Sequence, residues 1–297
     1  MVIFSDTRTS LLNCRTILFL QNMIFMIEFK HFWLKIFSSF RNLLIRGIFL
    51  GWLGLLSGVV LPAYAQDESL KIGVAANLLL PMQKIKQLYE EKFGSTLVLI
   101  PGSSGKLTAQ ILNGAPYDIF LSADMKFPAR IQKEGHAATS PQVLLRGRLA
   151  FWSKEKPDQP LQEWLRQSEI RSVALAQPEL APYGQRAKDW LQEQGLYDHL
   201  LPKVIFGESI GQVNQYIRSG TVEAAFTAIS AMHADALRNQ GYWQALDIKS
   251  GDPSRLDHGM VLLTNATGEQ RTIDQFVEFI LSPIAEKVFL EFGYETP

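Results

Sequence analysis

The sequence predicts an α/β protein made of two small domains that are joined by two crossing segments. From Leu70 onward, short apolar runs alternate with amphipathic helical patterns, which is typical of parallel sheets covered by helices. The alternation restarts after residues 146–148, and one more strand pattern follows the second run at residues 258–264. A chain that enters a second domain and returns makes a two-segment hinge, with a ligand cleft between the domains.

The first run of the alternation has the pattern strand–helix–strand–helix–strand. Pro81 suits the first turn of a helix, and Gly94 ends the same helix. We expect strands at 70–76, 96–100 and 117–121, with helices at 81–93 and 106–112. Three strands are few for a covered sheet, so a further strand must come from elsewhere in the chain.

The second run contributes strands and helices in the same alternation. We expect strands at 149–152, 173–176, 204–206, 224–228 and 258–264, and helices at 161–166, 185–194, 211–218, 269–281 and 283–292. The crossings then fall near residues 141–150 and 250–258. This divides the body into domain I (66–145 plus 256–297) and domain II (146–255).

Residues 1–65 have the features of a secretory signal peptide. Arg41 and Arg46 precede an uncharged run at 47–61, which is short for a membrane span, and Ala63-Tyr64-Ala65 is a small-x-small cleavage signal. We expect cleavage after Ala65 and a periplasmic location, with a retained anchor as the alternative. A 65-residue signal is long, so Met26 is a candidate for the true start. No cysteine follows the apolar run to accept a lipid.

Charge and composition exclude several classes of protein. The chain of 297 residues has no net formal charge, but residues 1–65 hold six Lys or Arg and two Asp or Glu, which leaves 23 basic and 27 acidic residues in 66–297. A mildly acidic body offers no basic face for nucleic acid. Any anion that it binds must be held by local donors.

Cysteine and histidine give no sign of a metal or redox centre. Cys14 is the only cysteine, so the body has neither disulfides nor thiolate sites. The body's histidines have no paired spacing, and we interpret them as surface or helix-end residues: His136, His199, His233 and His258.

Five junctions between a strand and the segment after it carry small residues. Helix starts there would present free backbone N–H groups, and the helix dipole also favours negative charge. The junctions are Ala75-Ala76-Asn77, Gly102-Ser103-Ser104-Gly105, Ser122-Ala123-Asp124, Ala181-Pro182-Tyr183-Gly184 and Gly207-Glu208-Ser209-Ile210-Gly211. The alternative interpretation is ordinary helix capping by Asn77, Ser104 and Ser122, with Tyr183 packing on a domain surface.

Nucleotide and hydrolase motifs do not fit these junctions. Gly105-Lys106 resembles the end of a phosphate-binding loop, but Ile100 stands where that motif needs glycine and Leu107 where it needs Ser or Thr. The spacing of residues 102–105 is also wrong for a nucleophile elbow. We interpret Lys106 as a solvated residue at a helix start, and no catalytic triad or carboxylate pair can be assembled.

The linked motifs resemble those of the periplasmic molybdate-binding proteins of ABC transporters, over about residues 70–297. The matching segments are 74–77, 102–107, 109–111, 113–124, 181–184, 282–283 and 292–294. The resemblance implies a type II periplasmic-binding-protein fold, with two α/β domains joined by a two-segment hinge. It also implies a solute receptor with no enzyme activity and no cofactor. Its ligand would be molybdate or tungstate, and its partner an inner-membrane ABC transporter permease; we expect a monomer.

The resemblance also implies which residues hold the oxyanion. They are Asn77 with the Ala76 backbone, Ser104, the Ala123 backbone, Tyr183 and the Ile210 backbone. Some members have serine in place of Asn77, and many of those have a tyrosine where this chain has Ala228. Tyr183 would here replace that phenol, which leaves the preference between molybdate and tungstate open.

Two other functions remain as alternatives. A receptor for sulfate or phosphate would share the fold, although a protonated phosphate benefits from an acceptor carboxylate. Asp118 and Asp124 are the only acids beside the first-half motifs, and neither matches a ligand position. A serine hydrolase or transferase would lack an identifiable general base.

Overall fold

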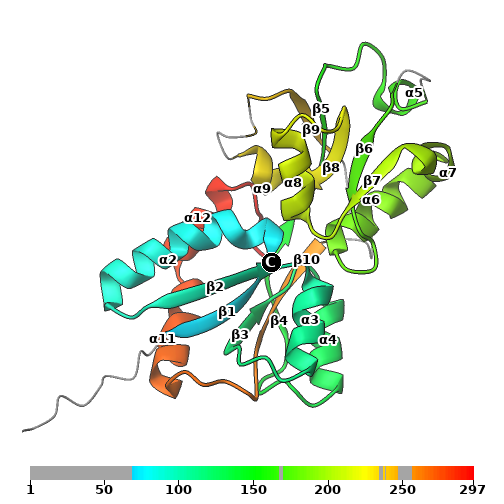
Figure 1. Ribbon diagram of the computed structural model, residues 1–297. Coiled ribbons are helices and arrows are strands. Elements are labelled where there is room, and N and C mark those ends of the chain that lie inside the picture. The colour runs from blue at the N-terminus through cyan, green and yellow to red at the C-terminus, as the bar shows by residue number, and fades with distance from the viewer. Residues whose placement is uncertain (1–68, 167–169, 234–236, 238, 247–255) are drawn as a thin grey trace, which may run out of the picture. The chain divides into compact units, whose positions relative to one another are not determined.

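Short buried strands and amphipathic helices alternate along the part of the chain that the computed structural model describes (Figure 1). The described residues are 69–166, 170–233, 237, 239–246 and 256–297. The predicted signal peptide, its cleavage site and the alternative start at Met26 lie outside them. Among the described residues, no helix is long and apolar enough to span a membrane.

The first lobe is built on a five-stranded sheet with the strand order β2-β1-β3-β10-β4. Its strands are β1 (Leu70–Ala75), β2 (Leu97–Gly102), β3 (Ile119–Leu121), β4 (Gln142–Gly147) and β10 (Leu256–Leu262). The first three run parallel, as the strand–helix alternation predicts. Strand β10 runs antiparallel to both β3 and β4, so it supplies, together with β4, the strands that the first run lacked.

Helices cover both faces of this sheet (Figure 1). They are the 3₁₀ turn η1 (Ala76–Leu78) and the helices α2 (Leu79–Phe93), α3 (Ser104–Leu112), α4 (Lys126–Lys133), α11 (Gln270–Ile280) and α12 (Pro283–Glu291). Ile119 and Leu121 pack in the core cluster that contains α2 and α11, whereas Phe120 between them packs with α3 and α4. This alternation is the two-residue period of a strand buried on both faces.

The second lobe has its own five-stranded sheet with the order β7-β6-β8-β5-β9. Its strands are β5 (Leu149–Ser153), β6 (Val173–Ala176), β7 (Val204–Gly207), β8 (Ala224–Ala228) and β9 (Tyr242–Ala245). Strand β6 is parallel to β7 and β8, and β5 is antiparallel to β8 and β9. The helical segments are α5 (Leu161–Trp164), α6 (Pro182–Glu193), α7 (Tyr197–Leu200), η2 (Leu201–Lys203), α8 (Ile210–Arg218) and α9 (Ile229–Met232).

The chain passes from one sheet to the other between Gly147 and Leu149, within the predicted first crossing. It leaves the second sheet after Ala245 and re-enters the first at Leu256, and residues 247–255 of this second crossing lie outside the described residues. The two lobes are therefore joined by two strands of the first sheet, β4 and β10, as a two-segment hinge requires.

Seven elements of the described residues were not predicted from the sequence. They are the helices α4, α7 and α9, the 3₁₀ turns η1 and η2, and the strands β4 and β9. Helix α4 has Pro128 in its third position and only eight residues, so its apolar period is short. Strand β4 has two buried apolar residues and β9 has none. Neither strand therefore forms a continuous apolar run.

Candidate functional site

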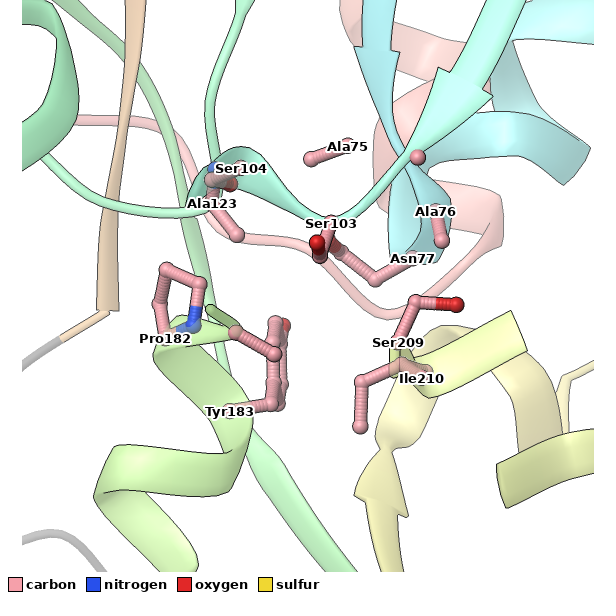
Figure 2. Close-up of a pocket in the computed structure, with 12 residues that line it drawn as sticks. Ala75, Ala76, Asn77, Ser103, Ser104, Ala123, Pro182, Tyr183, Ser209 and Ile210 are labelled. Atoms are coloured by element: carbon pink, nitrogen blue, oxygen red, sulfur yellow. Dashed lines mark hydrogen bonds between the residues drawn. The ribbon is translucent and has the colours of Figure 1, made fainter. Parts of the chain in front are cut away.

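The carboxyl ends of β1, β2 and β3 in the first lobe and of β6 and β7 in the second border one small cavity (Figure 2). The cavity and its opening to solvent together contain about 200 Å³ that no atom fills. Its lining is Ala75, Ala76, Asn77, Gly102, Ser103, Ser104, Ala123, Ala181, Pro182, Tyr183, Ser209 and Ile210. The structure thus brings together all six residues that the resemblance implied as oxyanion ligands, from both lobes.

Three helices of eight or more residues begin at this cavity, namely α3, α6 and α8. Each directs the partial positive charge of its dipole toward the same space. In α3, the Gly105 and Lys106 N–H groups are already bonded to Leu180 and Ser103. None of the twelve lining residues is charged at neutral pH. The arrangement can bind an anion through neutral donors, without a cationic side chain.

The capping interpretation was wrong in its residues. Ser103, not Ser104, is the N-cap of α3 and accepts from the Lys106 N–H at 3.4 Å. Asp124, not Ser122, accepts from the first turn of α4, at Phe127 N–H. Because neighbouring residues make these capping hydrogen bonds, the hydroxyl of Ser104 is not used to cap a helix.

Ser104 is buried and bonded in a way that keeps its hydroxyl hydrogen available. Its Oγ accepts from the Ala123 N–H at 3.1 Å. An oxygen that already accepts a hydrogen bond is polarised and donates more strongly. Ser104 and Ala123, predicted as separate donors, are therefore coupled in the structure.

Tyr183 lies in the first turn of α6 and is only 1% exposed. Its hydroxyl is buried and has no hydrogen-bond partner among the described residues. The hydroxyl of Tyr294 is a polar neighbour. Burial raises the pKa of Tyr183 well above its ordinary value, and Tyr294 adds to the rise. The phenol is therefore a neutral donor at every physiological pH, and its packing on a domain surface, the alternative interpretation, is wrong.

The side-chain amide of Asn77 forms hydrogen bonds with two buried residues. Its Nδ2 donates to His258 Nε2 at 2.7 Å and to the Tyr294 hydroxyl at 2.9 Å. His258 Nδ1 lies 2.9 Å from the Leu256 carbonyl oxygen, which can only accept. The proton is therefore on Nδ1, and Nε2 accepts from Asn77. Both amide hydrogens are engaged in this arrangement, which the sequence did not indicate.

The interpretation of His258 as a surface or helix-end histidine was wrong. The side chain is fully buried in β10, and burial lowers the pKa of His258 to about 4. His258 shares a strand face with the buried residues Leu256 and Met260, at a spacing of two. That spacing is the signal in the sequence that could have placed this histidine inside the protein.

We predict that His258 makes the protein less stable as the pH falls. Its pKa is about 6.5 in the unfolded chain and about 4 in the folded protein, so the unfolded chain binds more protons between these values. The free energy of unfolding should fall by about 1 kcal/mol between pH 6 and pH 5 from this group alone. Melting curves recorded at several pH values should show that the melting temperature falls more steeply with decreasing pH in the parent than in His258→Gln. Equal slopes would contradict the prediction.

The two acids near the motifs do not reach the cavity. Asp118 is fully buried and accepts from the backbone N–H groups of Lys71, Thr267 and Gly268, at 2.6, 2.6 and 2.8 Å. Asp124 accepts from the Phe127 N–H in the first turn of α4, and burial raises the pKa of Asp124. Both carboxylates serve the first lobe, so no carboxylate acceptor is among the described lining residues of the cavity.

Two α/β lobes, joined by two strands and presenting helix starts to a shared cavity, define the class of two-domain solute receptors with the type II fold. Comparison with known proteins agrees. The family model described as "Bacterial extracellular solute-binding protein" matches residues 70–295. The chain belongs to this family.

Individual relatives are similar over most of the chain. The molybdate-binding protein ModA of Rhodobacter capsulatus is 31% identical over 245 residues, which are 82% of this chain and 94% of the relative. Among solved structures, the periplasmic molybdate-binding protein of Azotobacter vinelandii has a TM-score of 0.70 and 27% identity, covering 77% of this chain and 99% of that one. The substrate-binding domain of a putative molybdenum ABC transporter from Clostridium difficile has a TM-score of 0.57 and 25% identity, covering 77% and 99%.

Proposed function

We propose that this protein is a periplasmic receptor that captures molybdate or tungstate between its lobes and delivers it to an ABC transporter permease of the inner membrane. The observation that carries the proposal is the cavity where α3, α6 and α8 begin, together with the unpartnered Tyr183 hydroxyl buried in its wall. The names of the similar proteins from Rhodobacter capsulatus and Azotobacter vinelandii support molybdate as the ligand.

The donor set suits a fully deprotonated oxyanion. Molybdate and tungstate carry no proton near neutral pH, so their oxygens only accept hydrogen bonds. Donors are available from the hydroxyls of Ser104 and Tyr183 and from backbone N–H groups at the first residues of the helices, including Ile210. The Ala76 and Asn77 N–H groups, and the Ala123 N–H once Ser104 turns toward a ligand, complete the proposed set.

The rival oxyanions differ in protonation and in size. Phosphate carries a proton near neutral pH and would need an acceptor, which the carboxylates of Asp118 and Asp124 do not supply here. Sulfate has the same charge and acceptors as molybdate, so only the shorter sulfur–oxygen bonds can exclude it. Poor hydrogen bonds to a buried charge lose about 1.5–3 kcal/mol each, so two misfits exceed about a hundredfold in affinity.

We infer further that the protein acts without catalysis and without a cofactor, as a monomer that binds no nucleic acid. Its family is described as one of extracellular solute-binding proteins. The described lining residues include no histidine, lysine, cysteine or carboxylate that could act as a general base. Export by the signal peptide, with cleavage after Ala65, fits the periplasmic location of the Azotobacter vinelandii protein.

Calorimetric titration with molybdate, tungstate, sulfate and phosphate tests the proposal. Molybdate and tungstate should bind, with sulfate and phosphate at least about a hundredfold weaker. Sulfate or phosphate competing on equal terms with molybdate would contradict the proposed ligand and favour the other oxyanion receptor.

Ser104→Ala should weaken molybdate and tungstate together, by about tenfold, because it removes one hydrogen bond to a charged group. The loss is limited to this one bond because the Ala123 N–H, which bonds Ser104 Oγ in the structure, stays available as a donor in the variant. The same titrations measure the effect. Thr108→Val is the matched control, since the Thr108 hydroxyl bonds the Ser104 carbonyl oxygen and does not line the cavity. Parent-like affinity in Ser104→Ala would remove Ser104 from the set of ligands.

A further inference from the structure

The first turn of α3 contacts the second lobe at two points outside the cavity lining. The Gly105 N–H donates to the Leu180 carbonyl oxygen at 2.8 Å. Lys106 Nζ lies 2.8 Å from Glu208 Oε1. Helix α3 belongs to the first lobe, whereas Leu180 precedes α6 and Glu208 precedes α8 in the second. Both contacts therefore exist only while the lobes meet.

Glycine at position 105 is explained by the second lobe and not by backbone conformation. A Cβ at this position would lie 3.0 Å from Leu180 Cα, 3.1 Å from the Leu180 oxygen and 3.2 Å from Phe127 Cζ. The first two atoms are backbone of the opposite lobe and cannot turn aside as a side chain can. A side chain at position 105 would thus hold the lobes apart at the point where the hydrogen bond forms.

The charges of Lys106 and Glu208 are paired with each other and not with the cavity. Their side chains are about half exposed, at 51% and 47%. A lysine beside an anion site would otherwise draw in any anion, so pairing with Glu208 keeps the site dependent on its neutral donors. Lys106 is thus an exposed residue at a helix start that does not line the cavity, as the sequence predicted, and the structure adds its ion pair with Glu208.

We propose that Gly105 and Lys106 form an interlobe clasp, which holds the lobes together over the cavity and slows the release of the bound ligand. The clasp rests on the proposed function for the identity of that ligand, but its contacts join protein to protein. The glycine supplies close approach and a hydrogen bond, and the lysine supplies an ion pair. Gly105 and Lys106 are positioning residues, since neither touches the ligand.

The release rate of molybdate, measured by stopped-flow displacement, tests the ion pair. Lys106→Ala and Glu208→Ala should each release molybdate about twofold to fivefold faster, the range of an exposed ion pair. The exchanged pair Lys106→Glu with Glu208→Lys should return toward the parent rate. Salt should speed release from the parent more than from Lys106→Ala, because an exposed pair is screened.

A matched control exists within the first lobe. Lys84 on α2 pairs with Glu291 on α12, and their side chains are similarly exposed, at 47% and 43%. Lys84→Ala removes an ion pair that does not cross between lobes, so its release rate should equal that of the parent. The clasp would be overturned if the release rate rose as much in Lys84→Ala as in Lys106→Ala. It would also be overturned if the exchanged pair did not return toward the parent release rate.

Gly105→Ala tests the other half of the clasp and should have the larger effect, about tenfold faster release. The distance between the lobes can be measured without any ligand. Residues 66–297 contain no cysteine, so Lys133→Cys on α4 and Gln192→Cys on α6 give two clean labelling sites once Cys14 is replaced or removed. Gly105→Ala and Lys106→Ala should shift the label distances toward the open form.

The two measurements separate failure of the clasp from failure of the proposed function. If the parent does not bind molybdate, the proposed ligand is wrong and the label distances alone decide the clasp. If the parent binds molybdate and the label distances in Gly105→Ala and Lys106→Ala match those of the parent, the clasp is wrong and the proposed function stands.

Discussion

Replacing Tyr183 by phenylalanine is expected to weaken molybdate and tungstate by about 10-fold to 150-fold. The phenol would donate one hydrogen bond to a charged ligand. Such a hydrogen bond contributes about 1.5–3 kcal/mol. Nothing in the cavity substitutes for it, since position 228 is alanine and cannot donate. Because burial raises the pKa of Tyr183, the loss should be the same across neutral pH. Calorimetry on the variant measures it.

The same replacement should stabilise the protein in the absence of ligand. The Tyr183 hydroxyl is buried without a hydrogen-bond partner, so removing it also removes the cost of its desolvation. We expect the free energy of unfolding to rise by about 1 kcal/mol and the melting temperature by about 2–4 °C. Affinity and stability thus change in opposite directions, which a general loss of structure would not produce.

Tyr294→Phe is the matched control for the stability measurement. Tyr294 is equally buried, but its hydroxyl accepts from Asn77 Nδ2 and bonds Ser230 Oγ at 3.0 Å. Removing it leaves buried partners unpaired, so the melting temperature of Tyr294→Phe should fall. If Tyr183→Phe binds molybdate as tightly as the parent, the tyrosine is not a ligand.

The periodicity of apolar residues predicted most strands and helices because those elements are buried in continuous runs. The sequence also predicted that the chain would cross between domains near residue 147 and return near 256, since the alternation restarts there. It could not predict β4 or the antiparallel direction of β10 between β3 and β4. Strand direction depends on which strands meet in space, and the partners here are more than 100 residues apart.

The residues around the cavity could be predicted, but not how they bond to one another. Small residues after a strand are visible in the sequence. The hydrogen bonds from the Ala123 N–H to Ser104 Oγ and from Asn77 Nδ2 to His258 Nε2 depend on the fold. Gly147 is another example. It marks a domain crossing in the sequence, whereas in the structure a Cβ there would overlap the Tyr183 hydroxyl and the His258 ring.

Gly184→Ala is expected to destabilise the protein and to abolish most of its ligand binding. Gly184 follows Tyr183 in the first turn of α6, and a Cβ there would overlap the carbonyl oxygen and carbon of Ala176 at the end of β6. Backbone cannot rotate away as a side chain can, so the start of α6 must move off the sheet. Overpacking of this kind costs about 1–3 kcal/mol, which corresponds to about 2–12 °C in melting temperature.

The displaced helix start would carry Tyr183 with it, so affinity for molybdate should fall at least as far as in Tyr183→Phe. Gly211→Ala provides the control, since Gly211 is also in the first turn of a helix at the cavity. A Cβ at Gly211 would meet only Ser209 Oγ at 3.4 Å and Ala76 Cβ at 3.5 Å, which are ordinary contacts. Alanine favours helix over glycine by about 1 kcal/mol, so Gly211→Ala should melt at or above the parent temperature. If Gly184→Ala has the same melting temperature as the parent, α6 can begin farther from β6 without loss of stability. The close approach of Gly184 to β6 would then not be what positions Tyr183.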